Sequence, residues 1–84
     1  MRVLSLDEAL DADIFWYESM CAYDSEYGRV SGINGSSVAI TRLGHGGWAY
    51  EDLRNYSVDW RCWNRKPEDS ERKAVPWTPL PEEG

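Results

Sequence analysis

The stretch RVSGINGSSVAITRL, residues 29–43, decides what kind of fold this chain can adopt. Its central Asn34-Gly35 is the dipeptide most typical of a tight β-hairpin turn, because both residues tolerate a positive φ. β-branched and apolar residues flank the turn on both sides, as two paired strands require. A two-residue loop places Ile33 on the face of Val38, whereas a three-residue loop places Val30 there. Both registers predict that Val38 and Ile40 lie in the core.

Two further strands are predicted on either side of this hairpin. Residues 14–22 are rich in Ile, Phe, Trp and Tyr, which suit a pleated and half-buried surface. Residues 58–64 alternate with period two, so that Trp60 and Cys62 lie on one face and Arg61 and Trp63 on the other. The chain between residues 44 and 47 is a glycine-rich break that separates the hairpin from the later strand.

Short helices are predicted at both ends of the chain. The sequence Ser5-Leu6-Asp7-Glu8 matches a capping box, and apolar residues follow at helical spacing. Residues 67–74 begin with Pro, carry acids early and cations late, and so complement a helix dipole. We therefore expect a mainly β fold, a small SH3-like antiparallel barrel of four or five strands with a short N-terminal and a short C-terminal helix. An open sheet packed by one helix is the alternative.

Length and composition predict one small domain. The chain has 84 residues, which is enough for a single core, and five Trp, five Tyr and one Phe supply its bulk. We expect this domain to span residues 1–78 and to be followed by a loose acidic tail, residues 79–84. Because small cores are often completed by association, we also expect a homo-oligomer.

Charge and cysteine content exclude several classes of protein. The net charge is -6, and this overall acidity argues against direct, nonspecific nucleic-acid binding. No apolar run is long enough to span a membrane, and no signal peptide is recognisable, so a cytoplasmic protein is expected. Cys21 and Cys62 lie far apart without a metal-binding spacing, which predicts free thiols and no metal site.

The segment from Trp60 to Lys66 carries the strongest functional signal. It holds two Trp and three cations within an acidic chain, and Arg beside Trp can grip a flat anion by charge and stacking together. The predicted ligand-binding residues, drawn from this segment and from the positive middle of the chain, are Arg61, Trp63, Arg65, Arg42, His45 and Tyr50. A structural role is the alternative, in which Arg61 and Arg65 pair with Asp59 or with acids of the N-terminal third, and Trp63 covers one end of the barrel.

The C-terminal half resembles a set of short accessory proteins from phages and integrative elements of gram-positive bacteria. The resemblance is carried by Trp60-Arg61-Cys62-Trp63, by Arg65-Lys66-Pro67 and by the run from Glu71 to Trp77. It covers most of the chain loosely and residues 60–77 rather specifically. It implies a mobile-element origin, the cytoplasm of a bacterial host as location, and counter-defence as a role.

These observations predict a non-catalytic protein that binds and sequesters a nucleotide-like anionic ligand, without any cofactor. No spacing of nucleophile, base and acid singles out a catalytic set. The alternative is an acidic inhibitor that occludes the nucleic-acid site of a host defence protein. Its predicted contact residues are the acids of the first third of the chain together with one tryptophan: Asp7, Glu8, Asp11, Asp13, Asp24, Glu26 and Trp77. Trp77 can instead pin the tail onto the domain.

Overall fold

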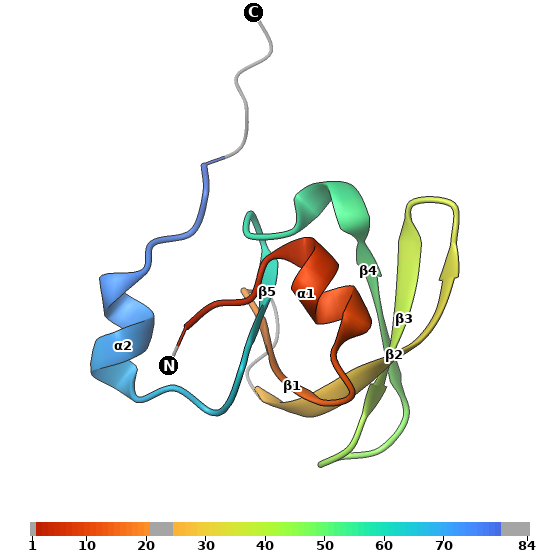
Figure 1. Cartoon of the computed structure of the whole chain (residues 1–84), viewed down its shortest axis with the longest axis horizontal. Coiled ribbons are helices and arrows are strands. Elements are labelled where there is room, and N and C mark those ends of the chain that lie inside the picture. The colour runs from red at the N-terminus through yellow and green to blue at the C-terminus, as the bar shows by residue number, and fades with distance from the viewer. Residues whose placement is uncertain (1, 21–24, 80–84) are drawn as a thin grey trace, which may run out of the picture.

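A computed structural model describes residues 2–20 and 25–79, which form five strands and two short helices (Figure 1). In chain order the elements are α1 (Leu6–Asp11), β1 (Phe15–Ser19), β2 (Glu26–Asn34), β3 (Ser37–Arg42), β4 (Trp48–Asp52), the 3₁₀ turn η1 (Leu53–Asn55), β5 (Trp60–Trp63) and α2 (Asp69–Ala74). All neighbouring strands are antiparallel, and their order across the sheet is β4-β3-β2-β1-β5. The predicted mainly β class with a helix near each end is confirmed.

The sheet is open, so the predicted SH3-like barrel is not confirmed. Among the described residues β4 and β5 form the two edges and do not pair with each other. The sheet curls strongly instead, and α1 lies within the curve (Figure 1). The alternative of an open sheet packed by one helix therefore describes the architecture better. Closure fails because β5 has only four residues, and its free edge is taken by the start of the chain.

That covering of β5 is made by the backbone of residues 2–4. The Leu4 N–H donates to the Cys62 carbonyl at 2.8 Å, and the Asn64 N–H donates to the Arg2 carbonyl at 3.1 Å. Val3 forms an isolated antiparallel bridge with Trp63. The polar groups of this edge strand are thus satisfied within the chain. Within residues 2–20 and 25–79, no segment covers β4 in this way at the other end of the sheet.

The central hairpin combines features of both predicted registers. Ile33 pairs with Val38 around a two-residue loop in which Gly35 has a φ of 63°. A bulge then shifts the pairing, so that Val30 lies opposite Ile40 and packs against the core. The extra residue of the bulge places both Val30 and Ile33 on the face of Val38 and Ile40, which are fully buried, whereas Ile33, next to the turn, is 52% exposed.

The core lies between the concave face of the sheet and α1. It is a cluster of aromatic and aliphatic side chains: Leu4, Ala9, Phe15, Tyr17, Val38, Ile40, Trp60 and Cys62.

The predicted capping box is confirmed, since Ser5 and Glu8 exchange side-chain to backbone hydrogen bonds. None of the described helices is long and apolar enough to cross a membrane. Residues 80–84 of the predicted tail lie outside the described part of the chain.

Gly28 and Gly32 provide a matched test of packing within β2. A Cβ at Gly28 would meet the Thr41 carbonyl oxygen at 2.9 Å and Ile40 Cγ2 at 3.0 Å, whereas one at Gly32 would meet nothing within 4 Å. We expect Gly28→Ala to lower the free energy of unfolding by about 1–3 kcal/mol, because backbone must move. Gly32→Ala should leave it unchanged or raise it slightly. Urea denaturation followed by Trp fluorescence measures both, and equal effects would contradict the assigned register.

Candidate functional site

The structure places Arg61 and Trp63 inside the protein, so they do not form the exposed stacking surface that the sequence predicts. Arg61 is 3% exposed and Trp63 is 1% exposed. Their period-two alternation with Trp60 and Cys62 is correct, since Arg61 and Trp63 both contact Glu18 on the convex face. That face, however, is covered here by α2 and by residues 75–79, and all four residues of β5 are buried.

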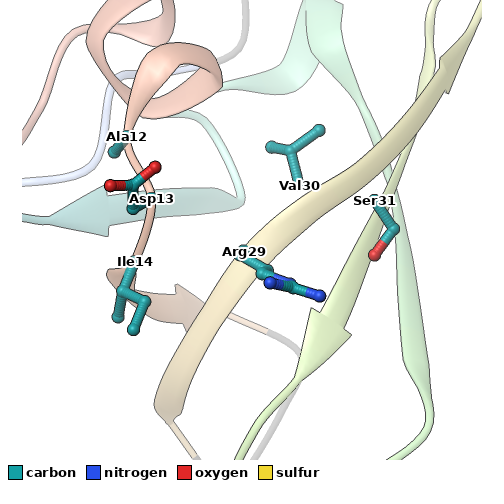
Figure 2. Close-up of a pocket in the computed structure, with 6 residues that line it drawn as sticks. All are labelled: Ala12, Asp13, Ile14, Arg29, Val30 and Ser31. Atoms are coloured by element: carbon teal, nitrogen blue, oxygen red, sulfur yellow. The ribbon is translucent and has the colours of Figure 1, made fainter.

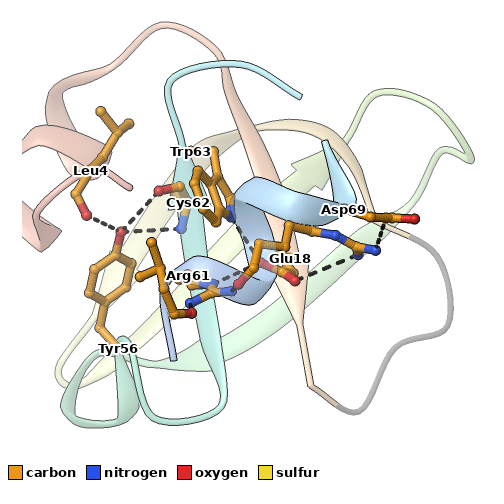
Figure 3. Close-up of polar contacts among 9 residues, drawn as sticks. Leu4, Glu18, Tyr56, Arg61, Cys62, Trp63 and Asp69 are labelled. Atoms are coloured by element: carbon orange, nitrogen blue, oxygen red, sulfur yellow. Dashed lines mark hydrogen bonds and ion pairs between the residues drawn. The ribbon is translucent and has the colours of Figure 1, made fainter. Parts of the chain in front are cut away.

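Glu18 is the centre of this buried cluster (Figure 3). It lies directly opposite Arg61 in the pairing of β1 with β5. Its Oε1 accepts from Arg61 Nε at 2.8 Å and from the Trp63 indole N–H at 2.8 Å, and Arg72 Nη1 lies 3.7 Å from Oε2. A carboxylate removed from water needs such charged and polar partners. The alternative structural role for Arg61 is therefore the one observed.

The C-terminal segment, residues 75–79, covers the cluster on the convex face of the sheet. The Arg61 guanidinium donates from Nη1 to the Val75 carbonyl at 2.7 Å, and its Cζ lies 4.2 Å from the centroid of the Trp77 ring. The ring of Trp63 lies on the guanidinium as well, at 5.1 Å. The Thr78 N–H donates to the Ser57 carbonyl at 2.7 Å and fixes the segment further. Trp77 thus pins the chain end, as one of the two predictions for it states.

His45 and Arg42, two other predicted ligand contacts, converge on Glu26. Arg42 donates from Nε and Nη2 to Glu26 Oε2, at 2.9 and 2.6 Å. The backbone N–H groups of Gly44 and His45 donate to Oε1, and His45 Nδ1 lies 2.7 Å from Oε2. The glycine loop therefore aims two backbone N–H groups at an anion. The anion is a carboxylate of the same chain.

Burial alone would raise the pKa of Glu26, but these hydrogen bonds outweigh it. The His45 backbone N–H and the Arg42 and His45 side chains hold the pKa of Glu26 at about 2. Glu26 is only 4% exposed, so it is not part of an acidic contact surface, and the prediction that it lies on one is wrong. It anchors the loop between β3 and β4 instead.

The remaining predicted residues are scattered. Tyr50 is 69% exposed on β4, and Arg65 is exposed after β5. Of the acidic surface, Asp7, Asp11 and Asp13 are exposed, whereas Glu8 forms a two-pronged ion pair with Arg2. Asp24 lies outside the described residues. The six predicted ligand contacts are thus not brought together into one pocket.

A cleft that the sequence reasoning missed lies beside the start of α2. It has a volume of about 290 Å³ and is lined by the indole of Trp16, two long cations and several smaller groups: Trp16, Ser25, His45, Lys66, Pro67, Asp69 and Arg72. The Lys66 ammonium lies 5.5 Å from the centroid of the Trp16 ring. Tyr27 packs edge-on against the same indole, with centroids 4.9 Å apart, and fixes its orientation.

A larger groove lies beside β2, between this strand and the segment that leads from α1 into β1 (Figure 2). Its volume is about 500 Å³, and it is lined by the residues that link α1 to β1 and by one edge of β2: Ala12, Asp13, Ile14, Arg29, Val30 and Ser31. One carboxylate and one guanidinium offset each other there, and no aromatic ring lines the groove. It therefore favours a planar anion less than the Trp16 cleft does.

Neither metal chemistry nor thiol chemistry finds support in the described residues. No group of three or more His, Cys, Asp or Glu side chains lies close enough to hold a metal ion within that part of the chain. Cys62 is a buried free thiol, and burial raises its pKa well above the ordinary value, so it is a poor nucleophile.

Comparison with known proteins identifies no relative: no family model, no curated protein and no solved structure matches this chain. The function must therefore be argued from the residues themselves.

The Glu18–Arg61 pair gives a direct test of the buried cluster. We expect Arg61→Met to lower the free energy of unfolding by about 3–5 kcal/mol, because it leaves a buried carboxylate without its partner. Arg54→Met is the matched control, since that guanidinium is 76% exposed and solvent screens its pair with Asp52, so the loss should be much smaller. Chemical denaturation measures both. A loss for Arg61→Met as small as that of the control would contradict the central role of this pair.

Glu26 gives a prediction for pH. Its folded-state pKa of about 2 lies below its ordinary value of 4.5, so the stability that it contributes is present above about pH 5. That contribution is lost as the pH falls from about 5 towards 2, where the carboxylate takes up a proton. We expect Glu26→Gln to be less stable than the wild type at pH 7 and to lose less stability over that window. Thermal melts at several pH values measure the difference, and parallel pH profiles would contradict it.

Proposed function

We propose that the protein is a non-catalytic binding protein that holds a small planar anion of the nucleotide class in the Trp16 cleft. The observation that carries the proposal is the half-buried indole of Trp16 with the Lys66 ammonium beside its ring, in a cleft of ligand size. A base or another flat ring can stack on an indole, and an ammonium can grip a phosphate.

Charge around the cleft favours an anion despite the net charge of the chain. Within residues 2–20 and 25–79, no carboxylate forms an ion pair with Lys66, which is exposed. Arg72 lies on the same rim and shares its charge between Glu18 and Asp69. His45 also lines the cleft, and its side chain is 55% exposed. Among the described residues that line the cleft, Asp69 is the one acid, and its side chain is 80% exposed.

The size of the cleft supports the same class of ligand. Its volume of about 290 Å³ lies just below the roughly 300–1,000 Å³ typical of small-molecule sites, which suits a small ligand. The site also preserves the chemistry of the sequence prediction, an indole among cations, while replacing Trp63 by the residue that lies opposite it in the sheet, Trp16.

A counter-defence role rests on the resemblance of residues 60–77 to accessory proteins of phages and integrative elements. In that setting binding alone would be sufficient, because a protein that sequesters a nucleotide signal needs no catalytic residue. The protein would act in the cytoplasm of the bacterial host.

Substitution of Lys66 tests the proposal. We expect ADP to bind with an affinity that Lys66→Ala and Trp16→Ala each weaken at least tenfold, since about 1.4 kcal/mol of charge or stacking is lost. Lys73→Ala is the matched control, because Lys73 is exposed on α2 and does not line the cleft. Isothermal titration calorimetry measures the affinities, with adenosine and inorganic phosphate as separate ligands. Absence of binding for all three ligands would refute the proposal.

A further inference from the structure

β4 is an open sheet edge whose exposed side chains are aromatic. Trp48 is 64% exposed and Tyr50 is 69% exposed, and both point to the convex face. An uncovered edge strand normally carries charge, proline or a bulge that prevents pairing with another chain. The described pairing of β4 has no bulge, and its two charged residues, Glu51 and Asp52, both lie at its C-terminal end, so Trp48, Ala49 and Tyr50 carry no charge.

The register identifies which backbone groups of β4 face outwards. The Arg42 N–H donates to the Gly47 carbonyl, and the Leu53 N–H donates to the Ser36 carbonyl. In an antiparallel pair the hydrogen-bonded positions alternate, so Ala49 and Glu51 also point their backbone groups at β3. The N–H and C=O groups of Trp48 and Tyr50 therefore point away from the sheet.

The two ends of this edge are already occupied. The Asp52 carbonyl, which also points outwards, accepts from the Trp60 indole N–H at 2.8 Å. At the other end the Gly46 N–H donates to the Arg42 carbonyl. The edge thus offers two residues, Trp48 and Tyr50, with one donor and one acceptor each.

We propose that β4 pairs with β4 of a second copy of this chain, antiparallel and centred on Ala49, to form a homodimer with one continuous sheet. In this register Trp48 lies opposite Tyr50 of the second copy, and Tyr50 opposite its Trp48. Four backbone hydrogen bonds then satisfy all eight outward groups of the two strands. A two-fold axis requires this kind of self-complementary pairing, and a shift by two residues would place the occupied Asp52 carbonyl in the ladder.

Side chains and charge agree with this register. On the convex face it creates two Trp–Tyr cross-strand pairs, a combination that stabilises antiparallel sheets. Ala49 meets its own copy on the axis, where the backbones are closest and a small side chain fits. Glu51 and Asp52 lie opposite Gly47 and Gly46 of the second copy, so the register brings no two carboxylates face to face.

The area predicts a dimer of moderate affinity. Because an aromatic side chain buries about 150–250 Å², the four exposed rings together remove on the order of 500 Å² from water. This is less than the roughly 1,200 Å² of a standard stable interface, so we expect a dissociation constant on the order of micromolar. The dimer goes beyond the proposed ligand binding and does not depend on it, since neither Trp48 nor Tyr50 lines the Trp16 cleft.

Sedimentation equilibrium on the purified chain tests the proposal. Between about 1 and 200 µM we expect a monomer–dimer equilibrium. Tyr50→Pro should shift the midpoint at least tenfold to higher concentration, because it removes an outward N–H and an interface ring without removing a bond to β3. Ile14→Lys is the control, since Ile14 is an apolar residue, 54% exposed, on the connection between α1 and β1 and therefore away from this edge. A monomer at all concentrations, or a dimer unaffected by Tyr50→Pro, would overturn the proposal.

Cysteine cross-linking tests the register separately and does not depend on the fold of the proline variant. In a Cys21→Ser background, Ala49→Cys should form a disulfide dimer under mild oxidation, because the paired Cα atoms would be about 4.5 Å apart. Tyr50→Cys should not, since the two copies of residue 50 would be offset diagonally by about 7–8 Å. Cross-linking of the second variant but not the first would overturn the pairing centred on Ala49.

Discussion

The buried carboxylate of Glu18 is the constraint on which the rest of the structure depends. Its charge has left water, and Arg61, the Trp63 indole and the more distant Arg72 take the place of that hydration. These partners come from β5 and α2, so one side chain of β1 fixes the position of both elements. Such a pair adds less to stability than its Coulomb attraction suggests, because desolvation opposes it. What it does determine is the pairing register.

The register matters here because β5 is short and buried on both faces. With apolar or aromatic side chains on each side, hydrophobicity alone would tolerate a slip by one residue. A slip would move Arg61 to the core face and leave Glu18 without its partner. The position of residues 75–79 depends on the same ion pair. The Arg61 guanidinium has further N–H groups and an open face, and the Val75 carbonyl and the Trp77 ring contact these. The chain end is thus ordered by the chemistry of β5.

Local features of the sequence were sufficient for much of the fold and insufficient for the site. The capping box at Ser5 and the hairpin around Gly35 depend on neighbouring residues, so their patterns predict them directly. The alternation in β5 was also correct. Alternation says which side chains share a face, however, and not whether another element covers that face. For this reason the prediction that Arg61 and Trp63 share a face is correct, whereas the prediction that this face is exposed is wrong. Likewise, no local pattern shows that Glu26 is the anion that the glycine loop holds.

The Trp16 cleft was missed because its parts are distant in sequence, although one signal was present. Strand alternation that begins at Phe15 places Trp16 and Glu18 on the same face of β1. A cation of a later strand that pairs with Glu18 therefore lies on the face of Trp16 as well. Once Arg61 is committed to Glu18, the cations of the segment divide into two groups with different roles. The Arg61 guanidinium is buried and pairs with Glu18, whereas the Lys66 ammonium lies at the surface beside the indole of Trp16. The dense run of Trp and cations from Trp60 to Lys66 therefore contributes mainly to a buried polar cluster. Its last cation, Lys66, lies in the cleft that we propose as the binding site.

The convex face of the sheet then separates into two regions with different physical requirements. α2 and residues 75–79 cover the part over β1 and β5, where charge is buried and must be matched by donors. The part over β3 and β4 has no cover among the described residues and exposes Trp48 and Tyr50 instead. The covered region satisfies its polar groups within the chain. The outward backbone groups of Trp48 and Tyr50 are open to water or to another strand, and the same strand in a second copy has the matching pattern.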